Sequence, residues 1–145
     1  MPVTAHDVAR RTFLVALAAP LIADTHQELV DFLGELASAL SQGNGDGFLS
    51  RIDRSTPDYY KLEQYIDALT AEDEVSCSLD IVKQEGDSQA QAIEVDWTLQ
   101  IHPRDILGSV ETRRQTVKIR LERKKKKWKI VALDPITLFA PPSVR

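Results

Sequence analysis

The chain has 145 residues, 43% of them hydrophobic and 28% charged, with a formal net charge of −4. This composition is typical of one soluble domain that buries a single core. The single cysteine, Cys77, excludes an internal disulfide, and the sequence has no Cys/His cluster of the kind that binds metal. Neither a metal nor another cofactor is therefore expected.

Residues 1–23 differ from the rest of the chain, because Arg-Arg-Thr-Phe-Leu at 10–14 leads into an apolar run. This segment resembles a twin-arginine export signal, although Val15 stands where lysine is common and Leu21 stands where a cleavage site has a small residue. The run is too short to cross a bilayer core of about 30 Å as a helix, so no integral membrane span is expected. We expect an export signal over 1–23, one domain over 24–142, and a periplasmic or extracellular location in a bacterium. The alternative is an amphipathic N-terminal helix packed on a cytoplasmic domain.

Three helices are expected in the first half of the domain. Thr25 and Glu28 have the spacing of a capping box, and apolar residues then recur every three or four positions up to the Gly-Asn-Gly-Asp-Gly segment at 43–47. Asp46 is placed to cap a short second helix, and Thr56 to cap the third. The glycine-rich segment lacks the alternating oxygen ligands and the closing glutamate of a calcium loop, so no metal site is expected there.

Four antiparallel strands are expected in the second half, because apolar and polar residues alternate from Glu74 onward. The clearest strand is Ala90–His102, which Pro103 ends. Turns are predicted at 85–88 and 124–127. Helices followed by strands that each have one apolar face indicate an α+β domain, in which three N-terminal helices pack on a curved four-stranded antiparallel sheet.

Two segments resemble a known superfamily. Ala-Leu-Ser-Gln-Gly-Asn-Gly-Asp-Gly-Phe-Leu at 39–49 and Trp-Lys-Ile-Val-Ala-Leu-Asp at 128–134 are similar to parts of nuclear transport factor two-like proteins, which include ketosteroid isomerase and polyketide cyclases. The resemblance covers about 25–139 and implies a cone-shaped pocket between sheet and helices, used by some relatives as an active site and by others for binding or assembly. One departure is that 53–57 leave no room for a strand pair often found between the second and third helices.

The predicted inward positions of the strands carry no carboxylate and no histidine. They are Val75, Cys77, Leu79, Ile81, Ile93, Val95, Trp97, Leu99, Ile101, Val117, Ile119 and Leu121. General acid and base catalysis needs a desolvated group of that kind, and Glu94 and Asp96 lie on the opposite, solvated face of their strand. We therefore expect a non-catalytic exported module that binds a small apolar ligand or another protein.

The candidate pocket residues are Tyr59, Tyr65, Cys77, Trp97 and His102. An alternative interpretation is an enzyme of the isomerase or cyclase type, in which Tyr59, Tyr65 or His102 reaches into a pocket on the concave sheet face. The tyrosines can equally be packing residues, and Cys77 a small buried hydrophobe. A further hypothesis is a homodimer formed through the outer face of the sheet.

Residues 104–129 are basic: they hold 11 of the 18 Lys and Arg and 3 of the 22 Asp and Glu, for a net charge of +8, while the remainder carries −12. The predicted basic patch consists of Arg113, Arg114, Lys118, Arg120, Arg123, Lys124, Lys125, Lys126, Lys127 and Lys129, on one hairpin's outer face and tip. A phosphate-rich polymer, acidic lipid headgroups or a second copy would fit such a charge. The favoured alternative is a solvated hairpin whose lysines prevent aggregation at a sheet edge. Specific nucleic-acid binding is not expected, because Trp128 is the only aromatic residue in the stretch.

Overall fold

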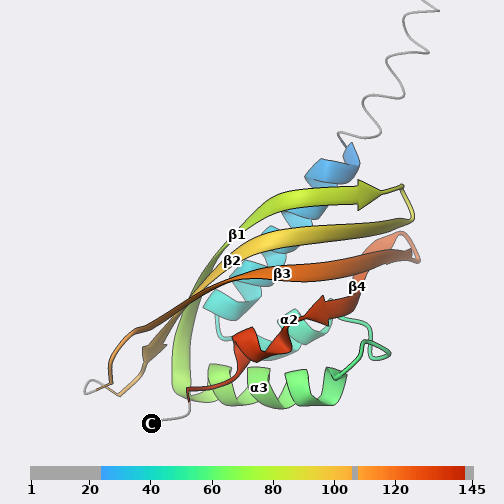
Figure 1. Ribbon diagram of the computed structural model, residues 1–145. Coiled ribbons are helices and arrows are strands. Elements are labelled where there is room, and N and C mark those ends of the chain that lie inside the picture. Colours follow the sequence, from blue (N-terminus) through green and yellow to red (C-terminus); the bar gives the residue numbers. More distant parts are fainter. Residues whose placement is uncertain (1–23, 106–107, 143–145) are drawn as a thin grey trace, which may run out of the picture.

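The computed structural model describes residues 24–105 and 108–142. The elements are an N-terminal helix, described over 24–41, α2 (Gly45–Leu49), α3 (Tyr59–Glu72), β1 (Asp73–Gly86), β2 (Ala90–Pro103), β3 (Glu111–Lys124), β4 (Lys127–Asp134) and the 3-10 helix η1 (Ile136–Phe139) (Figure 1). Helices followed by a four-stranded antiparallel sheet confirm the predicted α+β class. The expected export signal at 1–23 lies outside the described residues, within which no helix is long and apolar enough to cross a membrane.

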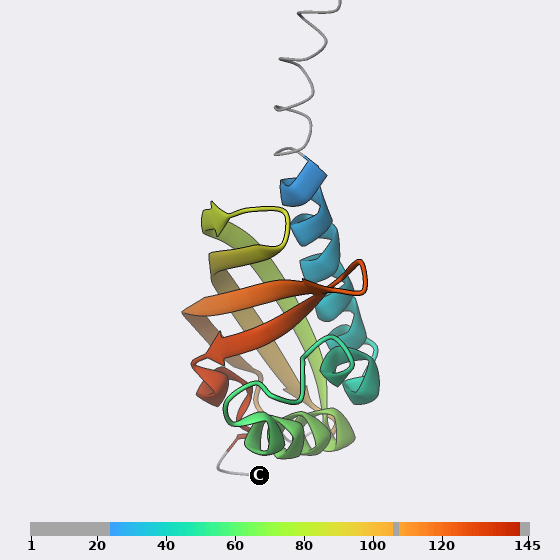
Figure 2. The same ribbon diagram turned by 90° about the vertical axis from the view of Figure 1, so that its right-hand side faces the viewer.

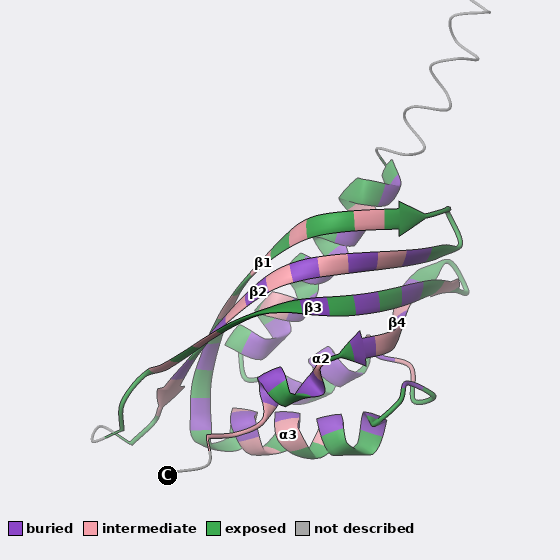
Figure 3. Cartoon of the chain, viewed as in Figure 1, coloured by how far each residue is buried: buried purple, intermediate pink, exposed green. Residues whose placement is uncertain are grey.

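The strands follow one another across the sheet in chain order, β1-β2-β3-β4, and each is antiparallel to its neighbour. The sheet curves, and the N-terminal helix, α2, α3 and η1 lie on its concave side (Figures 1 and 2). Buried residues alternate with more exposed ones along β2 and β3, as one buried face requires (Figure 3). The core therefore fills the space between the concave sheet face and the helices.

The core is centred on Trp97, whose side chain is fully buried. Trp97 packs edge-on against Phe139 of η1, with ring centroids 5.0 Å apart, and Phe139 contacts Phe48 of α2 at 5.6 Å. These three rings join sheet, C-terminal segment and helix layer. Trp97 is therefore a core residue.

The predicted start of the first helix is wrong. Residue 24 is already helical, so Thr25 is not the N-cap of this helix. Glu28 does not close a capping box: its carboxylate accepts hydrogen bonds from the Arg123 guanidinium (2.8 Å) and from Trp128 Nε1 (3.0 Å). A guanidinium from a distant strand is a stronger donor for a carboxylate than a backbone N–H.

The predicted caps of α2 and α3 are also wrong. Asn44, not Asp46, caps α2 by accepting a hydrogen bond from the Gly47 N–H (2.9 Å). Thr56 is buried before the start of α3, and its hydroxyl donates to the Ile130 carbonyl of β4 (3.0 Å). The Thr56 side chain therefore joins a loop to the sheet and leaves the helix end uncapped by it.

The loop between α2 and α3 contributes only a short edge contact to the sheet. Ile52 and Ile130 form an isolated parallel bridge, in which Asp53 N–H donates to the Ile130 carbonyl (2.8 Å) and Ile130 N–H donates to the Arg51 carbonyl (3.0 Å). This bridge lies where the sequence left no room for a strand pair.

Candidate functional site

A cavity of about 820 Å³ lies where the last turn of α3, the ends of β1, β2 and β3, and the C-terminal segment meet. We call it the end cavity. It is lined by Ala71, Glu72, Asp73, Ile101, Pro103, Arg104, Asp105, Gly108, Ser109, Val110, Glu111 and Pro142. The start of β1, where it follows α3, is at the lower left of the fold in Figure 1.

Asp73 lies in the wall of this cavity at the junction of α3 and β1. The helix passes into the strand without a loop: Asp73 is the first residue of β1, and its backbone N–H still donates to the Leu69 carbonyl of α3. Asp73 alternates in phase with Val75 and is only 2% exposed. A helix–strand junction thus holds a buried carboxyl group on the concave face.

Glu111 brings a second carboxyl group to the same end. It is the first residue of β3, in phase with the buried Val117, and it pairs in register with Ile101 of β2. Asp73 pairs with Pro103 of the same strand. The expectation that the inward face carries no carboxylate is therefore wrong, because β1 and β3 begin earlier than their apolar alternation suggests.

Arg113 closes the wall formed by the C-terminal segment. Its guanidinium forms an ion pair with Glu111, and Nη1 donates to the carbonyls of Leu138 (2.8 Å) and Ala140 (2.5 Å). These bonds hold the chain that follows η1 against β3 and so position Pro142 in the cavity lining. Arg113 acts as a clamp for the cavity wall.

The cavity lining is acidic. Glu72, Asp73, Asp105 and Glu111 lie in the lining, and Glu111 is paired with Arg113. The cation in the described lining is Arg104, whose Nη2 donates to the Thr70 carbonyl (3.3 Å) at the C-terminal end of α3. Apolar side chains, among them Ile101 and Val110, line the remainder. Among the residues that the structure describes, no group of three or more His, Cys, Asp or Glu could hold a metal ion. The arrangement suits an organic molecule with an apolar body and a positive or hydrogen-bond-donating group.

Several solved structures have this arrangement of helices on a curved sheet. A nuclear transport factor two-like superfamily protein from Salmonella enterica matches with a TM-score of 0.62 at 12% identity, over 77% of this chain and 89% of its own. The chain has the nuclear transport factor two-like fold. A protein provisionally assigned as an aromatic ring hydroxylase from Novosphingobium aromaticivorans matches this fold with a TM-score of 0.67 at 11% identity, over 77% of this chain and 87% of its own.

A third structure of the nuclear transport factor two-like fold is the beta subunit of a benzoate 1,2-dioxygenase from Burkholderia mallei, with a TM-score of 0.59 at 13% identity, over 72% of this chain and 85% of that one. No model of a known protein family matches the sequence. No curated protein shows a significant sequence match. The likeness therefore establishes the fold and leaves activity to the site itself.

The five pocket candidates named from the sequence are spread over this nuclear transport factor two-like domain. Tyr59 is buried and lines a separate cavity of about 500 Å³, Tyr65 is half-buried against the core, and His102 pairs with Glu74 in register on the outer sheet face. The other two candidates are Cys77 and Trp97. All five are described residues, and none of them lines the end cavity. Following the strand alternation outward to Asp73 and Glu111 would have indicated the cavity residues.

Cys77 is not a nucleophile in this setting. Its thiol is partly buried beside the N-terminal helix, with Sγ 3.9 Å from the Ala37 carbonyl oxygen. Burial raises the pKa of the Cys77 thiol to about 11, so the group is protonated at neutral pH. Cys77 therefore serves as a packing residue.

The basic residues do not form one outer patch. Arg113 and Arg123 lie on the same face of β3 as its buried residues, and Arg123 stacks on Trp128 at 4.4 Å while donating to Glu28. This hydrogen bond is the main cause of the lowered pKa of Glu28. Two of the ten residues thus act inside the fold.

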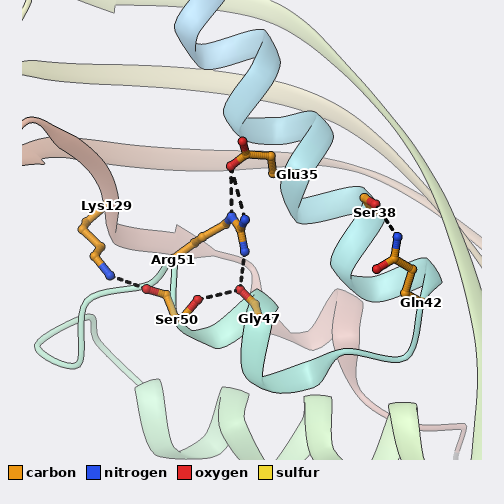
Figure 4. Close-up of polar contacts among 7 residues, drawn as sticks. All are labelled: Glu35, Ser38, Gln42, Gly47, Ser50, Arg51 and Lys129. Atoms are coloured by element: carbon orange, nitrogen blue, oxygen red, sulfur yellow. Dashed lines mark hydrogen bonds and ion pairs between the residues drawn. The ribbon is translucent and has the colours of Figure 1, made fainter.

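Three further residues of the predicted basic patch have partners on the surface. Arg114 pairs with Asp96 (2.6 Å), Lys124 pairs with Asp53 (2.8 Å), and Lys129 donates to the Ser50 carbonyl (Figure 4). Figure 4 also shows Arg51, which pairs with Glu35 of the N-terminal helix (3.3 Å). Among the described residues, the members of the patch without an ion pair are Lys118, Arg120, Lys125, Lys126, Lys127 and Lys129.

Proposed function

We propose that this chain is an exported, non-catalytic module that binds a small organic ligand in the end cavity. The observation that carries the proposal is a cavity of about 820 Å³ with an apolar wall and the buried carboxyl group of Asp73. Small-molecule sites in proteins have volumes of about 300–1,000 Å³ and combine apolar walls with a few polar groups. The acidic lining favours an aromatic or aliphatic amine or alcohol over a carboxylate.

The proposal is tested by titrating the full chain with benzylamine and, separately, with phenylacetate, while amide resonances are followed by NMR. Benzylamine is expected to shift the resonances of Ile101 and Val110, and phenylacetate is expected to leave them unchanged. Asp73→Asn removes the response, whereas Asp96→Asn, on the outer face of β2, retains it. Equal responses to both probes, or none, would contradict this assignment.

A second candidate function is catalysis of an isomerase or cyclase type. Asp73 favours it, because a carboxyl group that is 2% exposed in a cavity wall is placed to act as a general base. The direct test is deuterium exchange at the α-carbon of cyclohexanone in D2O, followed by NMR. Exchange above the buffer rate that is lost in Asp73→Asn supports the enzyme, and exchange at the buffer rate supports the binding module.

Export rests on the Arg-Arg pair and the apolar run within 1–23. Fusing residues 1–30 to a reporter that is active only after export tests it, with Arg10→Lys/Arg11→Lys as the matched control. Export of the fusion and retention of the control are expected. Cytoplasmic retention of both would favour the alternative location.

Homodimerisation through the outer sheet face is a further part of the proposal. Four of the charged residues on that face are paired within the chain, as Lys83–Glu94 (3.6 Å) and Arg114–Asp96 (2.6 Å), which lowers the cost of covering them. Sedimentation at two concentrations tests it, with the outer-face variant Thr98→Arg as the control. A monomer at both concentrations would remove the dimer from the proposal.

A further inference from the structure

The turn between β3 and β4 places lysine where lysine is conformationally costly. Lys124 and Lys127 close the hairpin, and the two residues between them, Lys125 and Lys126, have φ values of 51° and 68°. A two-residue turn with positive φ at both positions favours Asn-Gly, because side chains with a Cβ are strained there. The turn therefore has two positively charged residues at positions where the backbone conformation favours Asn and Gly.

These charges are exposed and mostly uncompensated. Lys125, Lys126 and Lys127 make no ion pair among the described residues, whereas Lys124 is paired with Asp53. Lysines on an edge strand hinder edge-to-edge pairing, but these four successive lysines lie at a hairpin tip, where they concentrate positive charge. The three free ammonium groups are available to an anion.

A groove of about 630 Å³ lies beneath this turn, between it and the N-terminal helix. Lys126, Lys127 and Lys129 line it together with Asp31. Two other carboxylates of the groove are already neutralised, because Glu28 is bonded to Arg123 (2.8 Å) and Glu35 to Arg51 (3.3 Å). The lining thus keeps a net positive charge.

The turn is held on a rigid base. Arg123, just before it, stacks on Trp128, just after it, at 4.4 Å, and both donate to Glu28. Arg123 also donates to the Ser88 carbonyl of the turn between β1 and β2 (2.8 Å). The lysines are therefore presented from a fixed surface beside the N-terminal helix (Figures 1 and 2).

From these contacts we infer that the β3–β4 lysine turn and the groove beneath it bind the phosphate groups of an anionic phospholipid surface. Each lysine held close to an anionic leaflet contributes about 1 kcal/mol to membrane binding. A lipid surface presents many phosphate groups side by side, so Lys125, Lys126 and Lys127, which make no ion pair among the described residues, can contact several of them at once.

A long nucleic acid fits these observations less well. Trp128, the aromatic residue nearest the turn, is only 7% exposed and its face is covered by Arg123, so it offers no stacking surface. This inference is independent of the end cavity and of the ligand proposed for it.

The test is sedimentation of the full chain with phosphatidylcholine vesicles that contain either no phosphatidylglycerol or one third of it. Lys125→Asn/Lys126→Gly removes two charges and supplies the residues that the turn prefers, so the variant is expected to fold and to melt at a higher temperature. Its binding to the anionic vesicles is expected to fall about 10- to 30-fold at low salt, with binding to neutral vesicles unchanged. Lys61→Gln/Lys83→Gln, which removes two charges elsewhere, is expected to lose less than about 2-fold.

Equal loss in the two double variants would show that net charge alone matters and would overturn the inference. Tighter binding of a single-stranded oligonucleotide than of the anionic vesicles, lost in the turn variant, would reassign the turn to nucleic acid. Asp73→Asn is expected to bind vesicles like the unaltered chain. Failure of ligand binding at the end cavity therefore leaves this result unaffected.

Discussion

Two arginines on the concave side of β3 hold the two ends of the sheet in different ways. Arg123 and Arg113 are similarly buried, with side chains 19% and 20% exposed, and each joins β3 to a segment distant in the chain. At Arg123 an indole ring packs against the guanidinium, at 4.4 Å, and both side chains also line the groove of about 630 Å³ beneath the lysine turn. At Arg113 the partners are backbone carbonyls and Glu111, and a cavity of about 820 Å³ stays open beside them.

The comparison shows that a half-buried arginine can pack against a buried aromatic side chain or border a cavity. We call the Arg123 end closed, because Trp128 is buried there, and the Arg113 end open, because the end cavity lies there. An arginine satisfied by an aromatic face and a carboxylate brings bulky apolar groups with it. An arginine that donates mainly to backbone carbonyls has few side chains packed around it, so the space beside it is less completely filled. The closed end should therefore carry stability, and the open end should tolerate substitution while it determines ligand binding.

The largest effect is expected from opening the closed end. Trp128→Ala removes a side chain that is 7% exposed, together with its stacking on Arg123 and its hydrogen bond to Glu28. The free energy of unfolding is expected to fall by about 3–5 kcal/mol, as for other buried aromatic residues. Urea denaturation measures this, and Tyr60→Ala, at a ring that is 71% exposed, is the control with a change within about 0.5 kcal/mol.

The next effect is expected from releasing the wall of the open end. Arg113→Leu leaves the carbonyls of Leu138 and Ala140 without their charged donor, and the free energy of unfolding is expected to fall by about 1–3 kcal/mol. Faster amide exchange at Ala140 should accompany the loss. The neighbouring Arg114→Leu removes only an exposed ion pair with Asp96 and should change stability by less than about 1 kcal/mol. Equal losses in the two variants would contradict a clamp at Arg113.

A smaller, pH-dependent effect is expected at Glu28. Its pKa is lowered from 4.5 in the folded chain, first by the hydrogen bond from Arg123. A carboxyl group with a lowered folded-state pKa contributes stability above its unfolded pKa, and this contribution is lost as the pH falls through the folded value. Glu28→Gln should therefore melt lower than the unaltered chain at neutral pH, and the difference should shrink below pH 4.5. Glu85→Gln, at an exposed site, is the control, and a difference independent of pH would contradict the linkage.

The smallest effect on stability is expected from filling the open end. Val110 is 55% exposed and lines the end cavity. Val110→Trp therefore places an indole ring in the end cavity, as Trp128 places one against Arg123 at the other end of the sheet. The free energy of unfolding should change by about 0.5 kcal/mol or less, while the response to benzylamine is lost. Val82→Trp, at the exposed bulge of β1, should leave that response intact. Loss of both responses would mean that the cavity is not the binding site.

The sequence predicted the elements well where the signal is periodic. The alternation along Ala90–His102 gave β2, observed as Ala90–Pro103, and the lysine run at 124–127 gave the observed turn. The resemblance of 39–49 and 128–134 to nuclear transport factor two-like proteins gave the fold. These features could be read locally, because they depend on neighbouring residues along one strand or turn.

The cavity residues escaped prediction for a physical reason. Asp73 and Glu111 continue the inward phase of β1 and β3 with polar residues, so an apolar pattern stops before it reaches them. Trp97, one of the candidate pocket residues, is fully buried in the core. The alternation along a strand predicts which face of the sheet a side chain is on, but it does not predict which residues of other elements pack against that side chain.

By itself the sequence determined the fold class, the strand phases and the concentration of positive charge, because each depends on the order of residues along the chain. Only the tertiary structure decided which groups meet: Glu28 with Arg123, Thr56 with Ile130, and Arg113 with the C-terminal segment. A capping or ion-pairing side chain bonds to the strongest partner near it, and the packing of the elements determines which partners are near. The same packing placed Trp128 against Arg123 and left a cavity of about 820 Å³ beside Asp73.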